Sequence, residues 1–219
     1  DTEASPVSAA ERLALPAMIA PLTRRLALTR LTLEWSRRLR RQALALRPDE
    51  PLRIPASAAD ATRLAADLAR LIDDMETAGL PWDALRTLVP DDHAAYFQLT
   101  LDFLKIVTEA WPKHLVERGR VDPAVRRDTL IRDRAARLKA QGSPGPVVAA
   151  GSTGSIPATA ELLRVIAGLA NGAVVLPGLD QALDAAGWDA IGAVGPRASS
   201  VNASHGHPQF GLKLLLETN

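Results

Sequence analysis

The sequence predicts a strongly helix-rich α/β fold. Apolar residues recur every three or four positions through most of the first 140 residues, as on one face of an α-helix. Residues 141–146, Gln-Gly-Ser-Pro-Gly-Pro, are dense in helix breakers. Beyond them, two short apolar segments flank a helical pattern, which is typical of a parallel βαβ unit. We therefore expect a helical region over 1–141 and a small α/β unit over 142–219.

The helical region is predicted to contain five helices. The first covers 17–46, with Pro21 in its first turn, where the missing N–H is no loss. Ser57 and Asp60 have the spacing of a capping box ahead of the second helix, which Gly79 ends. The other three are expected near 82–88, from 91–92 to Trp111-Pro112, and from the N-cap Asp122 with Pro123 to Gly142.

The α/β unit is predicted to contain strands at 147–150 and 173–176, a loop at 151–155 and a helix at 158–169 between them. A polar segment over 195–206 precedes a last helix that opens near His207-Pro208. Two parallel strands do not make a stable sheet alone, which favours a fragment of a longer protein. The absence of an initiator Met favours the same interpretation.

Composition excludes several classes of protein. The 219 residues include 47% hydrophobic and 23% charged residues, too apolar a mixture for a disordered chain. No apolar run approaches the roughly 18 residues of a spanning helix, and no secretory signal is visible, so we expect a cytoplasmic protein without a membrane partner. The lack of Cys excludes disulfides, Cys-ligated zinc and iron–sulfur clusters within these residues.

The predicted loop Gly151-Ser152-Thr153-Gly154-Ser155 allows two chemical interpretations. A small-x-Ser-x-Gly pattern between strand and helix resembles a nucleophile elbow, and Asp180 or Asp184, then His205 or His207, follow in the order of a serine hydrolase. Alternatively, the loop presents N–H groups to an anion. No Lys follows a Gly as in a P-loop, and His205-Gly-His207 is too short a signal for a metal site. We predict no cofactor and no metal, and a plain structural turn is the third possibility.

Arginine is concentrated in two segments, within 24–47 and within 118–137. Arg binds phosphate in bidentate fashion, so either cluster could contact a nucleic-acid backbone, although acidic helices could equally neutralise them inside the fold. The net charge of +1 gives no overall attraction to DNA. The candidate DNA-binding residues are Arg24, Arg25, Arg37, Arg38, Arg40, Arg41, Arg126 and Arg127.

Residues 146–180, Pro-Val-Val-Ala-Ala-Gly-Ser-Thr-Gly-Ser-Ile-Pro-Ala-Thr-Ala-Glu-Leu-Leu and then Gly-Ala-Val-Val-Leu-Pro-Gly-Leu-Asp, closely resemble the alphaproteobacterial form of the AddB family of double-strand break repair proteins. Shorter stretches agree, among them Leu15-Pro16-Ala17, the helix 64–74, Phe103-Leu104 and His207-Pro208-Gln209.

The resemblance implies an internal part of the helicase-like region of such a subunit, whose partner is an AddA-type helicase–nuclease and whose substrate is a broken DNA end. It further implies that 142–219 is part of a RecA-like core. By this resemblance, residues 147–150 correspond to a strand that an Asp-Glu pair follows in active helicases of that superfamily. The pair holds Mg²⁺ and orients the attacking water. Here Gly151-Ser152-Thr153 follows, and the next acid is Glu161. We therefore expect a non-catalytic segment, with Gly151–Ser155 as the relic of a nucleotide motif.

Overall fold

The computed structural model describes residues 15–46, 57–84, 94–180, 182–191, 207 and 209–217, with the side chains of 40–46 and 94–99 outside that description. The chain divides into two compact units, Asp1–Arg126 and Arg127–Asn219. This division falls earlier than the boundary expected at 141–142, because most of the helix that precedes that boundary belongs to the second unit. The helix-rich α/β class is confirmed, with two pairs of parallel strands in the described residues.

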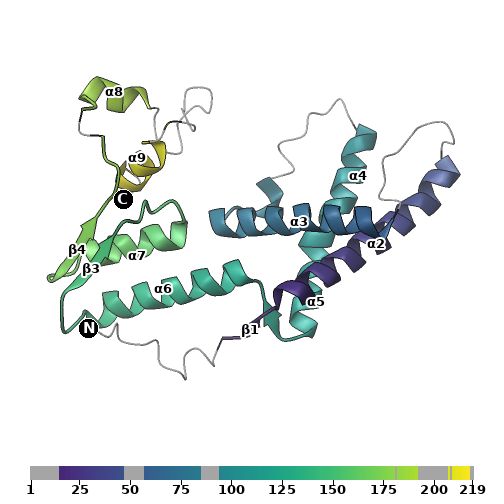
Figure 1. The fold of residues 1–219 in the computed structure, drawn as a ribbon, viewed down its shortest axis with the longest axis horizontal. Coiled ribbons are helices and arrows are strands. Elements are labelled where there is room, and N and C mark those ends of the chain that lie inside the picture. Colours follow the sequence, from purple (N-terminus) through teal and green to yellow (C-terminus); the bar gives the residue numbers. More distant parts are fainter. Residues whose placement is uncertain are drawn as a thin grey trace. The chain divides into compact units, whose positions relative to one another are not determined.

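The first unit is built on two long helices, α2 (Pro21–Leu46) and α3 (Ala58–Ala78), which pack against each other (Figure 1). The predicted caps of α3 are confirmed. Ser57 and Asp60 exchange both capping-box hydrogen bonds, and Gly79 ends the helix in the left-handed conformation at φ 64°. Apolar residues of α2, α3 and the helices that follow form one buried core: Ile19, Leu28, Trp35, Ala65, Leu68, Ile72, Ile106, Val107 and Trp111.

The start of the first predicted helix was wrong. Ala17–Met18 form a short strand, β1, which pairs in parallel with β2 (Arg120–Val121). The Ile19 N–H extends this pairing by donating to the Val121 carbonyl at 2.9 Å. The helix itself begins at Pro21, at the position where a proline is best tolerated.

The predicted helix end at Trp111-Pro112 was also wrong. In Figure 1 one continuous ribbon runs through α4 (Ala94–Lys105), a π turn η3 (Ile106–Ala110) and α5 (Trp111–Glu117). The Trp111 N–H donates to the Ile106 carbonyl, five residues back. Because Pro112 then stands in the first turn of α5, its missing N–H interrupts nothing. Of the short helix expected at 82–88, the structure describes a single 3₁₀ turn at 82–84.

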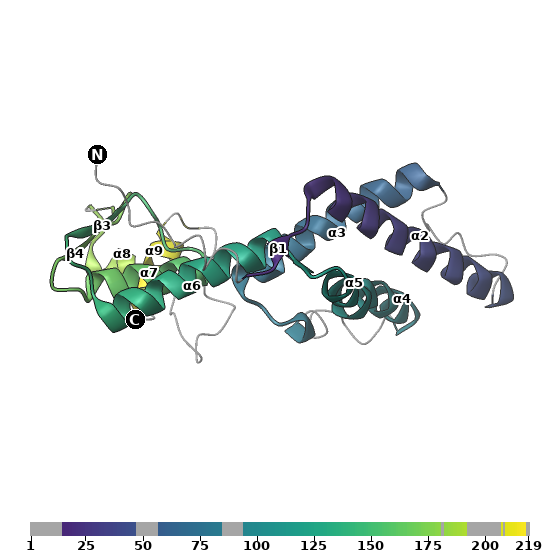
Figure 2. The ribbon, with the colours of Figure 1, turned by 90° about the horizontal axis from the view of Figure 1, so that it is seen from below.

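The second unit contains the predicted βαβ arrangement, shown in Figure 2. β3 (Val147–Ala150) pairs in parallel with β4 (Gly172–Val175), and α7 (Pro157–Ala167) connects them and packs on both. The helix α6 (Pro123–Gln141), which starts in the first unit, precedes them. Two further helices follow, α8 (Ala185–Ala190), which the sequence did not indicate, and α9 (Phe210–Glu217), the predicted last helix. Most of the polar segment 195–206 lies outside the described residues.

Candidate functional site

The loop after β3 is a tight turn that begins where the two strands end. The Gly151 N–H donates to the Val175 carbonyl at 3.0 Å and so closes the pairing of β3 with β4. Gly151 and Gly154 both adopt positive φ, at 79° and 64°. A Cβ added to Gly154 would lie 2.8 Å from both δ-carbons of Leu215, because α9 packs directly against the loop. Glycine is therefore required at Gly154 by both backbone conformation and space.

The polar groups of this loop bond mainly to one another. The Gly154 N–H donates to Ser152 Oγ, and the Thr153 hydroxyl donates to Ser155 Oγ, each at 3.4 Å. Ile156 begins α7 without a side-chain cap. The first acid after β3, Glu161, is one turn into α7, and its carboxylate lies 3.7 Å from Arg132 Nε. No carboxylate therefore follows β3 directly, as the sequence indicates.

The residues of the hydrolase interpretation are not joined by hydrogen bonds in the described part of the chain. Ser152 Oγ accepts from Gly154, and Asp180 Oδ1 accepts from the Ala182 N–H at 2.9 Å. His207 Nδ1 accepts from the Gln209 N–H at 3.1 Å, whereas a triad histidine donates from Nδ1 to its carboxylate. Asp184 caps α8 by accepting from the Gly187 N–H, and His205 lies outside the described residues.

Gln209 is a residue that the sequence reasoning missed. It is buried just before α9, its amide donates to the Gly178 carbonyl at 2.6 Å, and its side-chain oxygen accepts from the Asp180 N–H at 3.2 Å. It therefore fixes the segment after β4 to the start of α9. A single glutamine between His207-Pro208 and Phe210 carries no local signal for this role.

The arginines of α2 fall into two groups. Arg25, Arg37 and Arg38 are exposed, while the side chains of Arg40 and Arg41 lie outside the described residues. Arg24 is buried, with its Nε 2.7 Å from Asp122 Oδ1 and its NH2 2.8 Å from Asp73 Oδ1. A guanidinium used in this way is not available to a DNA backbone. The expectation that Arg24 contacts DNA is therefore corrected.

Asp122 is the centre of this buried network. The Trp111 indole N–H donates to Asp122 Oδ2 at 2.6 Å, and Arg24 lies on the other carboxylate oxygen. Burial raises the pKa of Asp122 above its ordinary value, and the Trp111 hydrogen bond and the Arg24 charge oppose that shift. Asp122 stands at the predicted N-cap position, directly before Pro123, and its carbonyl accepts from the Arg126 N–H at 3.0 Å, while its carboxylate is turned toward Trp111 and Arg24.

Arg126 and Arg127, the candidates from the second cluster, are half-buried. Arg126 Nε donates to the Pro16 carbonyl at 3.2 Å, and Arg127 Nε donates to Asp128 Oδ1 at 2.8 Å. Part of each guanidinium is therefore engaged within the fold.

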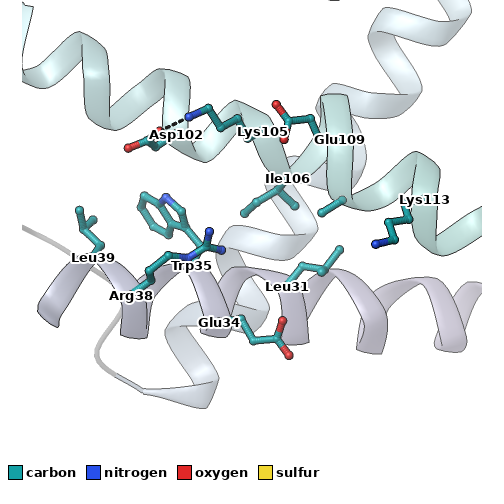
Figure 3. Close-up of a pocket in the computed structure, with 11 residues that line it drawn as sticks. Leu31, Glu34, Trp35, Arg38, Leu39, Asp102, Lys105, Ile106, Glu109 and Lys113 are labelled. Carbon is teal, nitrogen blue, oxygen red and sulfur yellow. Dashed lines mark hydrogen bonds and ion pairs between the residues drawn. The ribbon is translucent and has the colours of Figure 1, made fainter. Parts of the chain in front are cut away.

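A pocket of about 480 Å³ lies between α2 and the run from α4 to α5 (Figure 3). Its apolar lining consists of Leu31, Trp35, Leu39, Ile106 and Ala110. Its charged lining consists of Glu34, Arg38, Asp102, Lys105, Glu109 and Lys113. The sequence reasoning placed Trp35 on the apolar face of the first helix and assigned no pocket, because the two walls come from segments far apart in the sequence.

Among the residues that the structure describes, no cluster of His, Asp or Glu is arranged to hold a metal ion, and no helix is long and apolar enough to cross a membrane. No family model, no curated protein and no solved structure matches this chain.

Proposed function

We propose that the chain is a non-catalytic, helicase-like segment of an AddB-type subunit, which supports the resection of double-strand DNA breaks together with an AddA-type helicase–nuclease. One observation carries the proposal. The strand of a parallel βαβ unit ends at Ala150 and is followed by Gly151-Ser152-Thr153, with no carboxylate where a motor subunit needs one for Mg²⁺. The resemblance of residues 146–180 to the AddB family supplies the identity of the subunit.

The exposed arginines of α2 support a contact with DNA. Arg37 is exposed, and among the described residues neither it nor Arg25 forms an ion pair, whereas Arg30 pairs with Glu34 at 2.8 Å. Exposed guanidinium groups that form no ion pair, those of Arg25 and Arg37, can bind the phosphates of a duplex without reading its sequence.

The salt dependence of DNA binding tests this contact. A blunt-ended duplex is titrated with the full chain at 50–200 mM salt, and fluorescence anisotropy gives the affinity at each salt concentration. Each phosphate contact adds about 0.9 to the slope of log K against log salt, so Arg25→Gln with Arg37→Gln should lower the slope by about two. The matched control is Arg63→Gln, an exposed arginine of α3, which should change nothing. A salt-independent affinity, or an equal loss in the control, contradicts the DNA contact.

The identity of the subunit has a separate test. The native polypeptide that carries these residues is captured from its source cells, and its mass and the subunit bound to it are determined. The proposal expects a chain several times larger than 23.4 kDa, bound to a helicase–nuclease. A lone native chain of 23.4 kDa contradicts it.

A further inference from the structure

We propose that the pocket between α2 and the π turn η3 binds a small zwitterion with an apolar body, of the chemistry of a free apolar amino acid. This inference is independent of the proposed function, because it rests only on the lining of the pocket. A volume of about 480 Å³ lies within the range of pockets that enclose small molecules. Its walls come from two elements of the same compact unit, α2 and the run α4–η3–α5 (Figure 3).

The charges that line the pocket predict a ligand with both signs of charge. Asp102 and Lys105 neutralise each other at 2.7 Å. Glu34 is used outside the pocket by Arg30, at 2.8 Å. Among the residues that the structure describes, Arg38 and Glu109 form no ion pair, and Lys113 reaches Glu117 only at 4.0 Å.

Two cations and one anion thus remain to meet a ligand. In Figure 3 the Arg38 guanidinium and the Lys113 ammonium approach the gap between the helices from its two ends, while Glu109 stands on the opposite helix from Arg38. A ligand carboxylate suits Arg38, and a ligand ammonium suits Glu109. A simple anion would face Glu109 without compensation.

Trp35 adds an unpartnered polar group to the same wall. Its side chain is only 9% exposed, and its indole nitrogen is buried without a hydrogen-bond partner. A buried N–H without an acceptor costs free energy, which a ligand oxygen would recover. The nitrogen is buried in this structure, so an acceptor reaches it through a side-chain rearrangement of the kind that commonly accompanies binding. The ring packs edge-on against Phe103 at 4.9 Å and supplies, with Leu31 and Ile106, the apolar surface for the ligand body.

The wall opposite α2 contains the π turn η3, which is the third observation. Ile106, Glu109 and Ala110 stand at positions i, i+3 and i+4 of this turn and line the pocket together. Single π turns inside α-helices are frequent at functional sites.

The test uses L-phenylalanine as the probe and the indole N–H signals of the ¹⁵N-labelled full chain as the readout. The Trp35 and Trp111 signals are assigned from Trp35→Phe and Trp111→Phe. We expect saturable movement of the Trp35 signal, while the Trp111 N–H, already bonded to Asp122 at 2.6 Å, stays in place. 3-Phenylpropionate, which lacks the ammonium, and 2-phenylethylamine, which lacks the carboxylate, should each bind at least about tenfold more weakly.

Substitutions separate a specific site from nonspecific binding. Arg38→Gln and Glu109→Gln should each weaken the amino acid about tenfold, and Glu109→Gln should leave the binding of 3-phenylpropionate unchanged or improve it. The matched controls are Arg37→Gln, the exposed neighbour that does not line the pocket, and Asp74→Asn on α3. Circular dichroism confirms folding, and if one variant fails to fold, the other carries the test. The absence of saturable Trp35 movement, an analogue that binds as tightly as L-phenylalanine, or an equal effect of the controls overturns the proposal.

Discussion

The indole N–H of Trp111 donates a hydrogen bond of 2.6 Å to the Asp122 carboxylate inside the first unit. The same carboxylate lies 2.7 Å from Arg24, whose other nitrogens reach Asp73 on α3. One buried acid therefore ties the start of α5, the start of α6 and α2 together, and one of its partners is an arginine that was expected to contact DNA. The expected role of Arg24 changes because burial makes an unpaired polar group costly.

Trp111→Phe should destabilise the protein by about 1–3 kcal/mol, because it keeps the ring in the core and leaves a buried carboxylate oxygen without its donor. Urea unfolding measures the change. The comparison is Trp188→Phe, whose indole bonds to Glu217 at an exposed position and which should cost less than about 0.5 kcal/mol. If the two substitutions lowered the free energy of unfolding equally, the hydrogen bond from Trp111 to Asp122 would make no contribution of its own to stability.

Asp122→Asn should change the pH dependence of stability. Burial raises the pKa of Asp122 in the folded protein above its ordinary value of 3.8. At a pH between the pKa of Asp122 in the unfolded chain and its higher pKa in the folded protein, the folded state therefore binds more protons than the unfolded state. This contribution to stability is fully present below the unfolded pKa and is lost as pH rises through the folded pKa. The wild type should therefore gain stability relative to Asp122→Asn as pH falls from 7 toward 4.

Urea unfolding of the wild type and of Asp122→Asn at each pH gives the difference between their free energies of unfolding. The contributions of the other titrating groups cancel in that difference. Trp111→Phe enlarges it, because the Trp111 hydrogen bond lowers the pKa of Asp122. A difference that does not vary with pH, or that favours the asparagine variant in acid, would contradict a raised pKa.

The elements that could be predicted from the sequence are those whose ends are determined locally. The capping box at Ser57, the left-handed Gly79 and the glycine-rich segment before β3 each act within a few residues, and each is found where it was expected. The strand β1 could not be predicted, because its two residues are held by a partner at Arg120–Val121, about a hundred residues away. The π turn and the uninterrupted passage through Pro112 depend on tertiary packing in the same way.

The candidate site was harder to predict because burial decides the role of a charged residue. Arg24 and Arg25 are neighbours in the sequence and were expected to act alike, yet the turn of the helix buries the first against Asp122 and exposes the second. The pocket gave no signal, since its charged residues come from segments about seventy residues apart.

Ser152→Ala should leave any ester hydrolysis by the protein unchanged. Ser152 Oγ accepts a hydrogen bond from Gly154, and His207 Nδ1 is occupied as an acceptor, so no described base activates the serine. Hydrolysis of p-nitrophenyl acetate measures the activity, with Ser155→Ala in the same loop as the control. Loss of activity in Ser152→Ala alone would establish the hydrolase interpretation and contradict the proposed function.

Gly154→Ala should destabilise the second unit more than Gly151→Ala. Both residues have positive φ, so each substitution forces an alanine into the left-handed conformation at a cost of about 1–2 kcal/mol. A Cβ at Gly151 meets nothing within 4 Å, whereas a Cβ at Gly154 meets both δ-carbons of Leu215 at 2.8 Å. Overpacking of this kind adds about 1–3 kcal/mol.

The contribution of the contact with Leu215 is isolated by a double-mutant cycle. In a Leu215→Ala background the overpacking is absent, so Gly154→Ala should cost only as much as Gly151→Ala, although Leu215→Ala itself destabilises the core around α9. Urea unfolding of the four proteins of the cycle gives the coupling free energy. A coupling near zero would mean that the loop and α9 do not pack as the structure has them, and that the turn after β3 is held by its own hydrogen bonds alone.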